Sequence, residues 1–297
     1  MATLLNRFFT LAVLIVISTA SHADVFSILS PESENDTRQL YEVGLIKLAL
    51  EKTRDTYGDY EIRSIPVMNR NRVMQSLKDG RYPNLFIKTS YEKRFEDEGL
   101  DYVPFPIDRG IVGYRICFVP EKKKKAIAEI SRLEELKTLK HVQGAGWTDT
   151  KLLRAAGFDV HENPDYEGLF RMIAVGRADL FCRGVNELLD EWEAHKALKG
   201  LDYDESFILA YPLPRFFYTN ANNQQAICRL TDGILIAYRD GSLQNLWEAL
   251  YQQSIDFANL SKRKIFWIEN PELRNLDIDY QQYFYNPLPS PVSELDE

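Results

Sequence analysis

Histidine and cysteine are scarce in this sequence of 297 residues, which contains four histidines and three cysteines. The histidines form no HExxH motif and have no aspartate or cysteine at the spacing of metal ligands, so we expect no metal site. The motifs GxSxG, GxxxxGK(S/T) and GxGxxG are absent too, which leaves no signature of the enzymes that carry them. Although an active site can be assembled from distant residues, we expect no catalytic residues and no cofactor.

Positive charge is in deficit. The sequence has 36 Lys and Arg against 44 Asp and Glu, and the net charge of -8 argues against a nucleic-acid partner. The four lysines at residues 122–125 are therefore expected to form a solvated helix face rather than a basic groove. Hydrophobic residues at 45% and charged residues at 27% are ordinary for a globular protein, which argues against a disordered or polytopic membrane chain.

Long apolar runs are lacking except at the N-terminus. Arg7 precedes an apolar stretch at residues 8–17, and Ser21 and Ala23 place small residues where a signal peptidase cleaves. The stretch is shorter than the roughly 20 residues of a membrane-spanning helix. We therefore predict a cleaved signal peptide at residues 1–23, and an exported protein, rather than a retained anchor.

Export to an oxidising compartment makes the cysteines relevant. Cys117, Cys182 and Cys228 are odd in number and far apart, so at most one pair can form. Each lies within or beside an apolar stretch, which favours three small buried apolar residues over a disulfide.

Strand and helix patterns alternate along the mature chain, which predicts an α/β fold with mostly parallel sheets, in about two domains. The expected strands lie at residues 25–29, 60–65, 85–87, 114–119, 141–143 and 178–182. The expected helices cover residues 41–49, 71–78, 148–156, 166–175, 185–195, 227–238 and 243–250. Pro212 and Pro214 interrupt the apolar stretch at residues 207–218, which suits a strand that leaves one sheet and enters another. Residues 265–287 are expected to form an extended strap with little regular structure.

A glycine-containing turn between an expected strand and an expected helix is the first candidate binding site. Gly144 and Gly146 would let backbone N–H groups approach an anion at the helix N-terminus, where Thr148 adds a hydroxyl and Trp147 a stacking face. The alternative is that the glycines make only a tight turn and that Thr148 only caps the helix.

Arginines supply the other candidates. Arg183 and Asn186 follow the strand at residues 178–182, at the carboxyl end where open α/β sheets place ligands. Arg183 could clamp a carboxylate or form a salt bridge with a neighbouring acid, and the sequence leaves both open. Arg94 and Arg70 are further anion partners, although a single arginine is more often a surface charge.

Several segments, in this order, resemble the extracellular solute-binding proteins of family 3, the polar amino acid type of periplasmic binding protein. They are LKDGRY at 77–82, TSYEKR at 89–94, LKTLKHVQGAGWTDT at 136–150, VGRAD at 175–179 and YRDGSLQ at 238–244. The resemblance implies the two-lobed type II fold, in which two α/β lobes joined by two hinge strands close over a ligand. Lobe 1 would comprise residues 24–110 and 216–287, lobe 2 residues 111–215, and residues 288–297 a disordered tail.

The resemblance also assigns roles to single residues. Thr89 and Arg94 match the family's lobe 1 pattern, in which the arginine grips the α-carboxylate of the ligand. Gly144, Gly146 and Thr148 match the glycine-rich turn and the threonine that meet the ligand from lobe 2.

One departure from the family bears on the ligand. Amino acid binders place an aspartate for the ligand's ammonium where this sequence has Arg183-Gly184. A guanidinium in place of a carboxylate favours an anionic ligand, although Glu187 lies one helical turn further on and could still bind an ammonium.

The resemblance therefore predicts a monomeric periplasmic protein that captures a small polar, carboxylate-bearing ligand by hinge closure and delivers it to a membrane permease of the ABC type. The expected binding residues are Arg70, Thr89, Arg94, Gly144, Gly146, Trp147, Thr148, Arg183, Asn186 and Glu187. Two alternatives remain: a sensory component that docks on a membrane receptor, and an enzyme on the same scaffold.

Overall fold

The computed structural model describes residues 23–30 and 39–288. The predicted signal peptide lies outside the described residues except for Ala23, and so does the predicted tail except for Leu288. No helix in the described ranges is both long enough and apolar enough to cross a membrane.

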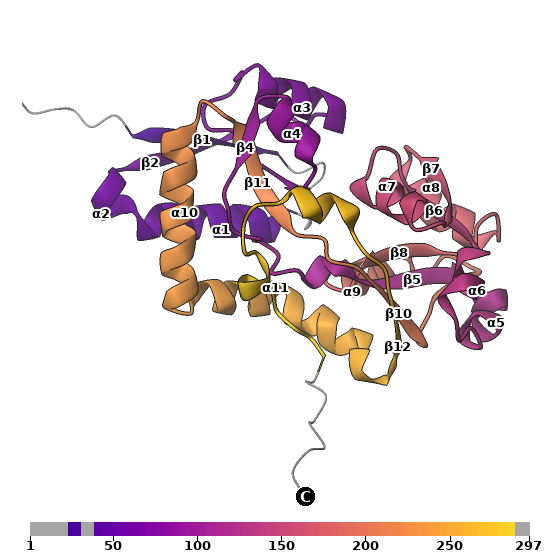
Figure 1. Ribbon diagram of the computed structural model, residues 1–297. Helices are drawn as coiled ribbons and strands as arrows, with labels where there is room; N and C mark the ends of the chain where they lie inside the picture. Colours follow the sequence, from indigo (N-terminus) through magenta and orange to yellow (C-terminus); the bar gives the residue numbers. More distant parts are fainter. Residues whose placement is uncertain (1–22, 31–38, 289–297) are drawn as a thin grey trace, which may run out of the picture.

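Two α/β lobes lie beside each other, with lobe 1 on the left and lobe 2 on the right of Figure 1. The strands of lobe 1 are β1 (Asp24–Leu29), β2 (Tyr60–Ile65), β3 (Ile87–Ser90), β4 (Leu100–Tyr102) and β11 (Arg215–Asn220). Its helices are α1 (Leu40–Lys52), α2 (Arg54–Tyr57), α3 (Arg70–Lys78), α4 (Lys93–Asp97) and α10 (Gln224–Arg239). A parallel bridge between Ser27 and Leu85 brings β1 alongside the chain that leads into β3.

Lobe 2 is built in the same way. Its strands are β5 (Tyr114–Pro120), β6 (Lys140–Gly144), β7 (Asp159–Asn163), β8 (Phe181–Gly184), β9 (Leu201–Tyr203), β10 (Phe207–Ala210) and β12 (Lys264–Trp267). Its helices are α5 (Lys124–Ala128), α6 (Leu133–Lys137), α7 (Thr148–Ala155), α8 (Tyr166–Ala174) and α9 (Leu188–His195). Short 3-10 turns lie at Ile111–Gly113, Glu121–Lys123, Leu260–Lys262, Pro271–Asn275 and Gln281–Tyr283.

The sheets are mixed, which corrects the expectation of mostly parallel pairing. The pairs β1–β2 and β6–β7 are parallel, as the alternation of strands and helices predicts. In lobe 1, however, β11 pairs antiparallel with both β3 and β4, and in lobe 2 β5 pairs antiparallel with β8, β9 and β10. Each of these pairs includes β5 or β11, which follow directly on the two segments that cross between the lobes, so the strand directions are set by long-range topology.

A long helix, α11 (Ser242–Ala258), packs against both lobes. It packs on α1 and α10 of lobe 1 and on α9 of lobe 2. The hydroxyl of Ser254 donates to the carbonyl of Val185 at 2.6 Å, and Trp247, fully buried, donates its indole N–H to the carbonyl of Asp108 at 3.2 Å. Helix α11 thus contacts lobe 2 and the hinge at once.

Two chain segments form the hinge, residues 103–113 between β4 and β5 and residues 211–214 between β10 and β11. The N–H of Tyr211 donates to the carbonyl of Gly113 at 3.0 Å, which ties the two segments together. Residue 113 must be glycine, because a β-carbon there would lie 2.3 Å from the carbonyl oxygen of Tyr211. The strand predicted to leave one sheet and enter another is confirmed, since β10 and β11 lie in different lobes.

The C-terminal region contains a strand that the sequence reading missed. β12 pairs in parallel with β10, so this part of residues 216–287 extends the sheet of lobe 2 and not lobe 1. A four-residue edge strand carries little local signal, because its partner lies more than fifty residues away in the sequence.

After β12 the chain runs back over the hinge as a strap, drawn in yellow in Figure 1. Asn270 donates its side-chain N–H to the carbonyl of Pro212 at 3.0 Å, and the N–H of Tyr285 donates to the carbonyl of Arg109 at 2.8 Å. The strap therefore contacts both hinge segments.

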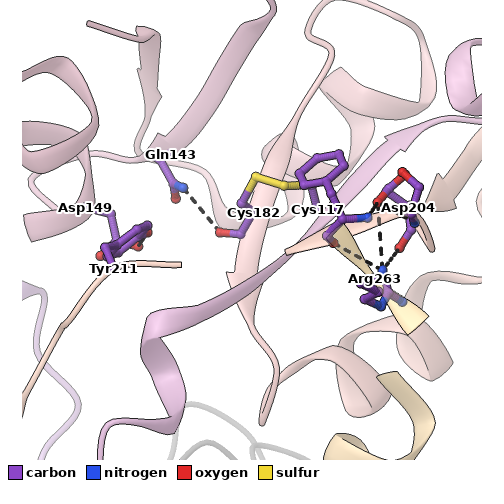
Figure 2. Close-up of a disulfide and its surroundings, with 9 residues drawn as sticks. Cys117, Gln143, Asp149, Cys182, Asp204, Tyr211 and Arg263 are labelled. Atoms are coloured by element: carbon purple, nitrogen blue, oxygen red, sulfur yellow. Dashed lines mark hydrogen bonds and ion pairs between the residues drawn. A yellow bond between two sulfur atoms is a disulfide. The ribbon is translucent and has the colours of Figure 1, made fainter. Parts of the chain in front are cut away.

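The cysteine prediction is wrong. Cys117 and Cys182 face each other across β5 and β8 and form a disulfide (Figure 2). Cys228 is a free thiol on an exposed face of α10. The backbone around the bond is held by side chains as well, since Gln143 donates its amide N–H to the carbonyl of Cys182 at 3.2 Å.

His141 lies in the core of lobe 2 and makes stability depend on pH. It is fully buried, packs edge-on against Phe158, and has no hydrogen-bond partner for either ring nitrogen in the part of the chain that the structure describes. Burial lowers the pKa of His141 to about 4, against 6.5 when exposed. Between these two values His141 is protonated in the unfolded chain but neutral in the native protein, so the free energy of unfolding falls as the pH falls.

We expect acidification from pH 7.5 to 5 to remove about 2 kcal/mol of unfolding free energy through this residue. Urea titrations at the two pH values measure it. The variant His141→Phe should lose that share of the pH dependence, whereas His161→Phe, at a half-exposed histidine, should keep it. Equal pH dependence in His141→Phe and the native protein would show that His141 does not control it.

Candidate functional site

The lobe 1 side of the interlobe region holds an arginine with a neutral partner. Arg70 begins α3, and its guanidinium donates to the hydroxyl of Thr89 on β3 at 3.0 Å. The side chain of Asn69 caps this helix by accepting the N–H of Arg72. Burial lowers the pKa of Arg70 and the nearby Glu92 carboxylate opposes this effect. Arg70 forms no ion pair among the described residues.

Arg94, the residue that the resemblance assigns to the ligand carboxylate, already has acidic partners. Its Nε donates to Glu92 at 2.7 Å, and a second nitrogen lies 3.7 Å from Glu98. Half of its side chain is exposed, and its guanidinium lies over the ring of Phe95. An anion would have to compete with Glu92 for this guanidinium.

Glu92 joins the two lobes directly. Its carboxylate accepts a hydrogen bond from the hydroxyl of Thr148 at 2.9 Å and from the ammonium of Lys151 at 2.6 Å, both on α7 of lobe 2. Burial acts to raise the pKa of Glu92, but hydrogen bonds from Arg94, Lys151 and Thr148 outweigh it and lower the pKa. We call these contacts the Glu92 latch. Thr148, expected to bind the ligand, is engaged in the latch.

The glycine turn is shaped by an aromatic ring. A β-carbon on Gly144 would lie 2.2 Å from the Trp147 ring, so the ring packs flat against a residue that must be small. Gly146 has a left-handed backbone with φ of 74°, and its N–H donates to the carboxylate of Glu162 at 2.8 Å. One of the donors expected for a ligand anion is therefore satisfied within lobe 2.

Arg183 forms the salt bridge that was the alternative to a ligand clamp. Its guanidinium contacts Glu191 at 2.7 Å and Glu187 at 3.1 Å, and it lies 4.7 Å from the centre of the Trp147 ring. The side chain is almost fully buried. Burial acts to lower the pKa of Arg183, but the two carboxylates raise it well above its ordinary value. With both acids in contact, Arg183 carries no spare positive charge for a ligand.

Glu187 and Asn186 fill the space beside Gly184. A β-carbon on Gly184 would lie 2.7 Å from Oδ1 of Asn186 and 3.0 Å from a carboxylate oxygen of Glu187. The N–H of Gly184 donates to that carboxylate at 3.0 Å. Oδ1 of Asn186 is buried and, within the described ranges, lacks a hydrogen-bond partner. The resemblance expects an aspartate where this chain has Arg183-Gly184. Glu187 supplies an acidic group beside that position instead.

Several buried charges that the sequence reading missed surround Glu187. Burial acts to raise its pKa, but Arg183, Arg215, Arg115 and Lys88 outweigh it and hold the pKa at about 2, so Glu187 is ionised at neutral pH.

Pairs of opposite charge link this group into one network between the lobes. They are Lys88–Glu42 at 2.6 Å, Lys88–Asp108 at 3.8 Å, Arg215–Asp108 at 3.5 Å, Arg215–Glu187 at 3.8 Å, Arg115–Glu187 at 3.9 Å and Arg115–Asp149 at 2.7 Å. The available sequence signal was a charged residue within an apolar strand, as at Lys88, Arg115 and Arg215.

Three of the cavities lie around these residues. One of about 310 Å³, which we call the lobe 1 pocket, lies among β1, β3, α1 and α3 and is lined in part by Arg70 and Lys88. One of about 270 Å³ lies between the lobes and is lined in part by Lys88 and Glu187. A third of about 550 Å³ separates Arg70 and Arg94 from Gly146. Lys88 therefore lies between the lobe 1 pocket and the acidic side chains of lobe 2.

No protein-family model matches the sequence, and no curated protein matches it either. Solved structures do match over most of the chain. An ancestral arginine-binding protein bound to arginine has a TM-score of 0.56 at 14% identity and covers 77% of this chain and 98% of its own.

The chain has the type II periplasmic binding protein fold. A putative binding component of an ABC transporter from Wolinella succinogenes, complexed with lysine, has a TM-score of 0.56 at 12% identity and covers 77% of this chain and 96% of its own. A histidine kinase sensor domain with similarity to periplasmic binding proteins has a TM-score of 0.54 at 15% identity and covers 77% and 95%. The likeness confirms the two-lobed fold implied by the sequence resemblance.

Proposed function

We propose that this periplasmic binding protein fold serves as a monomeric solute-binding protein of the periplasm, which takes up a small carboxylate-bearing compound of the amino acid class by hinge closure. The observation that carries the proposal is the charge arrangement at the interlobe region. Within the described part of the chain, lobe 1 presents the guanidinium of Arg70 with a hydroxyl as its sole partner, and lobe 2 presents the ionised carboxylate of Glu187. A ligand with one carboxylate and one ammonium is complementary to both.

The proposed ligand still carries the predicted carboxylate, but Arg70 binds it in place of Arg94 and Arg183. Arg183 and Arg94 are each in contact with acids, so the argument for a purely anionic ligand loses its two main residues. Structures of the same fold have been solved with arginine and with lysine, which carry a carboxylate and an α-amino group. The fold and the absence of a catalytic motif support binding without turnover.

A sensory role is the second candidate. A histidine kinase sensor domain has the same fold at a similar level of identity, so delivery to a permease and docking on a receptor use one scaffold. Neighbouring genes separate the two, because a permease and an ATPase favour transport whereas a sensor kinase favours signalling.

A thermal-shift screen of residues 24–297 against the common amino acids, dicarboxylates, sugar acids and small phosphates tests the proposal. A compound at 100 times its Kd adds about 2.7 kcal/mol to stability. We expect hits among amino acids and no hits among phosphates. A protein that responds to none of these compounds, although folded, would contradict a solute-binding role.

The Glu92 latch gives a prediction about closure. Glu92→Gln keeps the side-chain shape but removes the charge that binds Lys151, and charge-assisted hydrogen bonds contribute about 1.5–3 kcal/mol. We expect the affinity for the tightest compound of the screen to fall about 10- to 100-fold, with a larger radius of gyration for the unliganded protein in X-ray scattering.

Glu61→Gln is the matched control, because Glu61 pairs with Arg63 on the exposed face of β2 in lobe 1. It should leave the affinity unchanged. If Glu92→Gln binds as tightly as Glu61→Gln, the latch does not contribute to closure.

A further inference from the structure

The lobe 1 pocket is unusual for a polar binding site because its lining is mostly apolar. Nine of its thirteen lining residues are apolar, among them Ile46, Val73, Phe86 and Phe217. The pocket measures about 310 Å³, at the small end of the roughly 300–1,000 Å³ of small-molecule sites. It has room for a ligand of amino acid size.

The charges that line this pocket are not equivalent. Glu42 and Lys88 form an ion pair at 2.6 Å, so their charges compensate each other. Arg70 forms no ion pair among the described residues, and its hydrogen-bond partner, the hydroxyl of Thr89, is neutral. The pocket therefore has one uncompensated positive charge at an apolar wall.

We propose that the lobe 1 pocket selects a carboxylate with an apolar body, such as an amino acid with an aliphatic side chain. This inference rests on the proposed function and names its ligand class. Arg70 binds the carboxylate, and the alkyl chain fills the space lined by Ile46, Val73 and Phe86. A charged ligand side chain would have to enter this mostly apolar space, where Glu42 and Lys88 are already paired with each other, which is costly, so lysine, arginine and glutamate should bind more weakly.

Calorimetry with a homologous series tests the inference on the unaltered protein. The probes are alanine, 2-aminobutyrate, norvaline and norleucine, together with hexanoate, which lacks the ammonium. Each added CH₂ should tighten binding about fourfold until the pocket is full. Glutamate, arginine and lysine serve as probes with a charged side chain.

The outcomes separate the two proposals. A series in which affinity does not rise with chain length, while glutamate, arginine or lysine binds, would overturn the apolar ligand class and leave the solute-binding role intact. Binding of none of these compounds would overturn the apolar ligand class, and the solute-binding role would fall with it only if the thermal-shift screen also found no ligand. Binding of hexanoate as tightly as norleucine would support the pocket and show that the ammonium is not recognised.

Two variants locate the site within lobe 1. Arg70→Met should weaken every carboxylate at least tenfold without changing the dependence on chain length, whereas Arg72→Met, at an exposed cation of the same helix, should have no effect. Val43→Phe, at a partly exposed position of the lining, should fill the pocket and abolish the gain from the longer chains. Unchanged affinities in Arg70→Met would place the carboxylate elsewhere and overturn the assignment.

Discussion

Replacement of Arg183 by alanine is expected to lower the free energy of unfolding by about 3–5 kcal/mol, because it leaves two buried carboxylates without their shared cation. Glu187 and Glu191 lie within 3.1 Å of the guanidinium, and their side chains are only 23% and 10% exposed. The alanine would also remove the guanidinium from the face of the Trp147 ring. Urea denaturation of the purified variant measures the loss.

The pH dependence of this loss has a defined sign. Arg183 helps to hold the pKa of Glu187 at about 2, below its ordinary 4.5. Ionised Glu187 therefore stabilises the native protein above pH 4.5, and this contribution disappears as the pH falls towards 2. The difference in stability between Arg183→Ala and the native protein should narrow over the same interval.

Two further variants make the prediction specific. Arg171→Ala breaks the exposed pair between Arg171 and Asp165 and should cost less than about 1 kcal/mol. Glu191→Gln added to Arg183→Ala removes one of the stranded charges and should recover part of the stability. A folded Arg183→Ala with native stability and weakened ligand binding would instead restore the original prediction that Arg183 clamps the ligand.

Arg183 also illustrates what sequence can say about a site. The end of a strand and the start of a helix are local patterns, and the sequence predicts both near Arg183 and Glu187. The predicted bounds were off by two to three residues, since Arg183 lies within β8 and Glu187 is the N-cap of α9. Which acid completes the pair was not readable, because Glu191 reaches Arg183 only through the way α9 packs.

The fold was predictable where the signal was local. β2 occupies the predicted residues 60–65, and α7 begins at the predicted Thr148. The errors fall where pairing is long-range: β3 begins at Ile87, at the end of the strand expected at 85–87, and the directions of the strands that cross the hinge were not foreseen. Alternation of strands and helices fixes the class of fold, but it carries no information on which strand returns to the opposite lobe.

In the candidate site, too, the contacts that the sequence did not predict are those between residues of different elements. The proposed function rests on Arg70 and Glu187, since one lacks an ion pair among the described residues and the other is held ionised. Arg94 and Thr148 are engaged by Glu92, a residue that lies inside the TSYEKR segment but had no role in the sequence reading. Thr148 meets Glu92 only because the two lobes pack together, and no motif within one lobe predicts that contact.

Loss of the disulfide between Cys117 and Cys182 should be the other large effect. The bond closes a loop with a sequence separation of 65, for which the chain-entropy relation gives about 4 kcal/mol of stabilisation. It also joins β5 and β8, two neighbouring strands of lobe 2, beside the carbonyl that accepts a hydrogen bond from Gln143. Reduction of the native protein should therefore shift the urea midpoint strongly downward.

The double variant Cys117→Ala/Cys182→Ala should unfold at the lower midpoint and be insensitive to reductant. Cys228→Ala removes the exposed free thiol and should match the native protein in both conditions. Thiol titration of the denatured, unreduced protein should count one free thiol, since two of the three cysteines are bonded. Three free thiols in material purified from an oxidising compartment would contradict the bond, and an unchanged midpoint after complete reduction would show that it does not stabilise lobe 2.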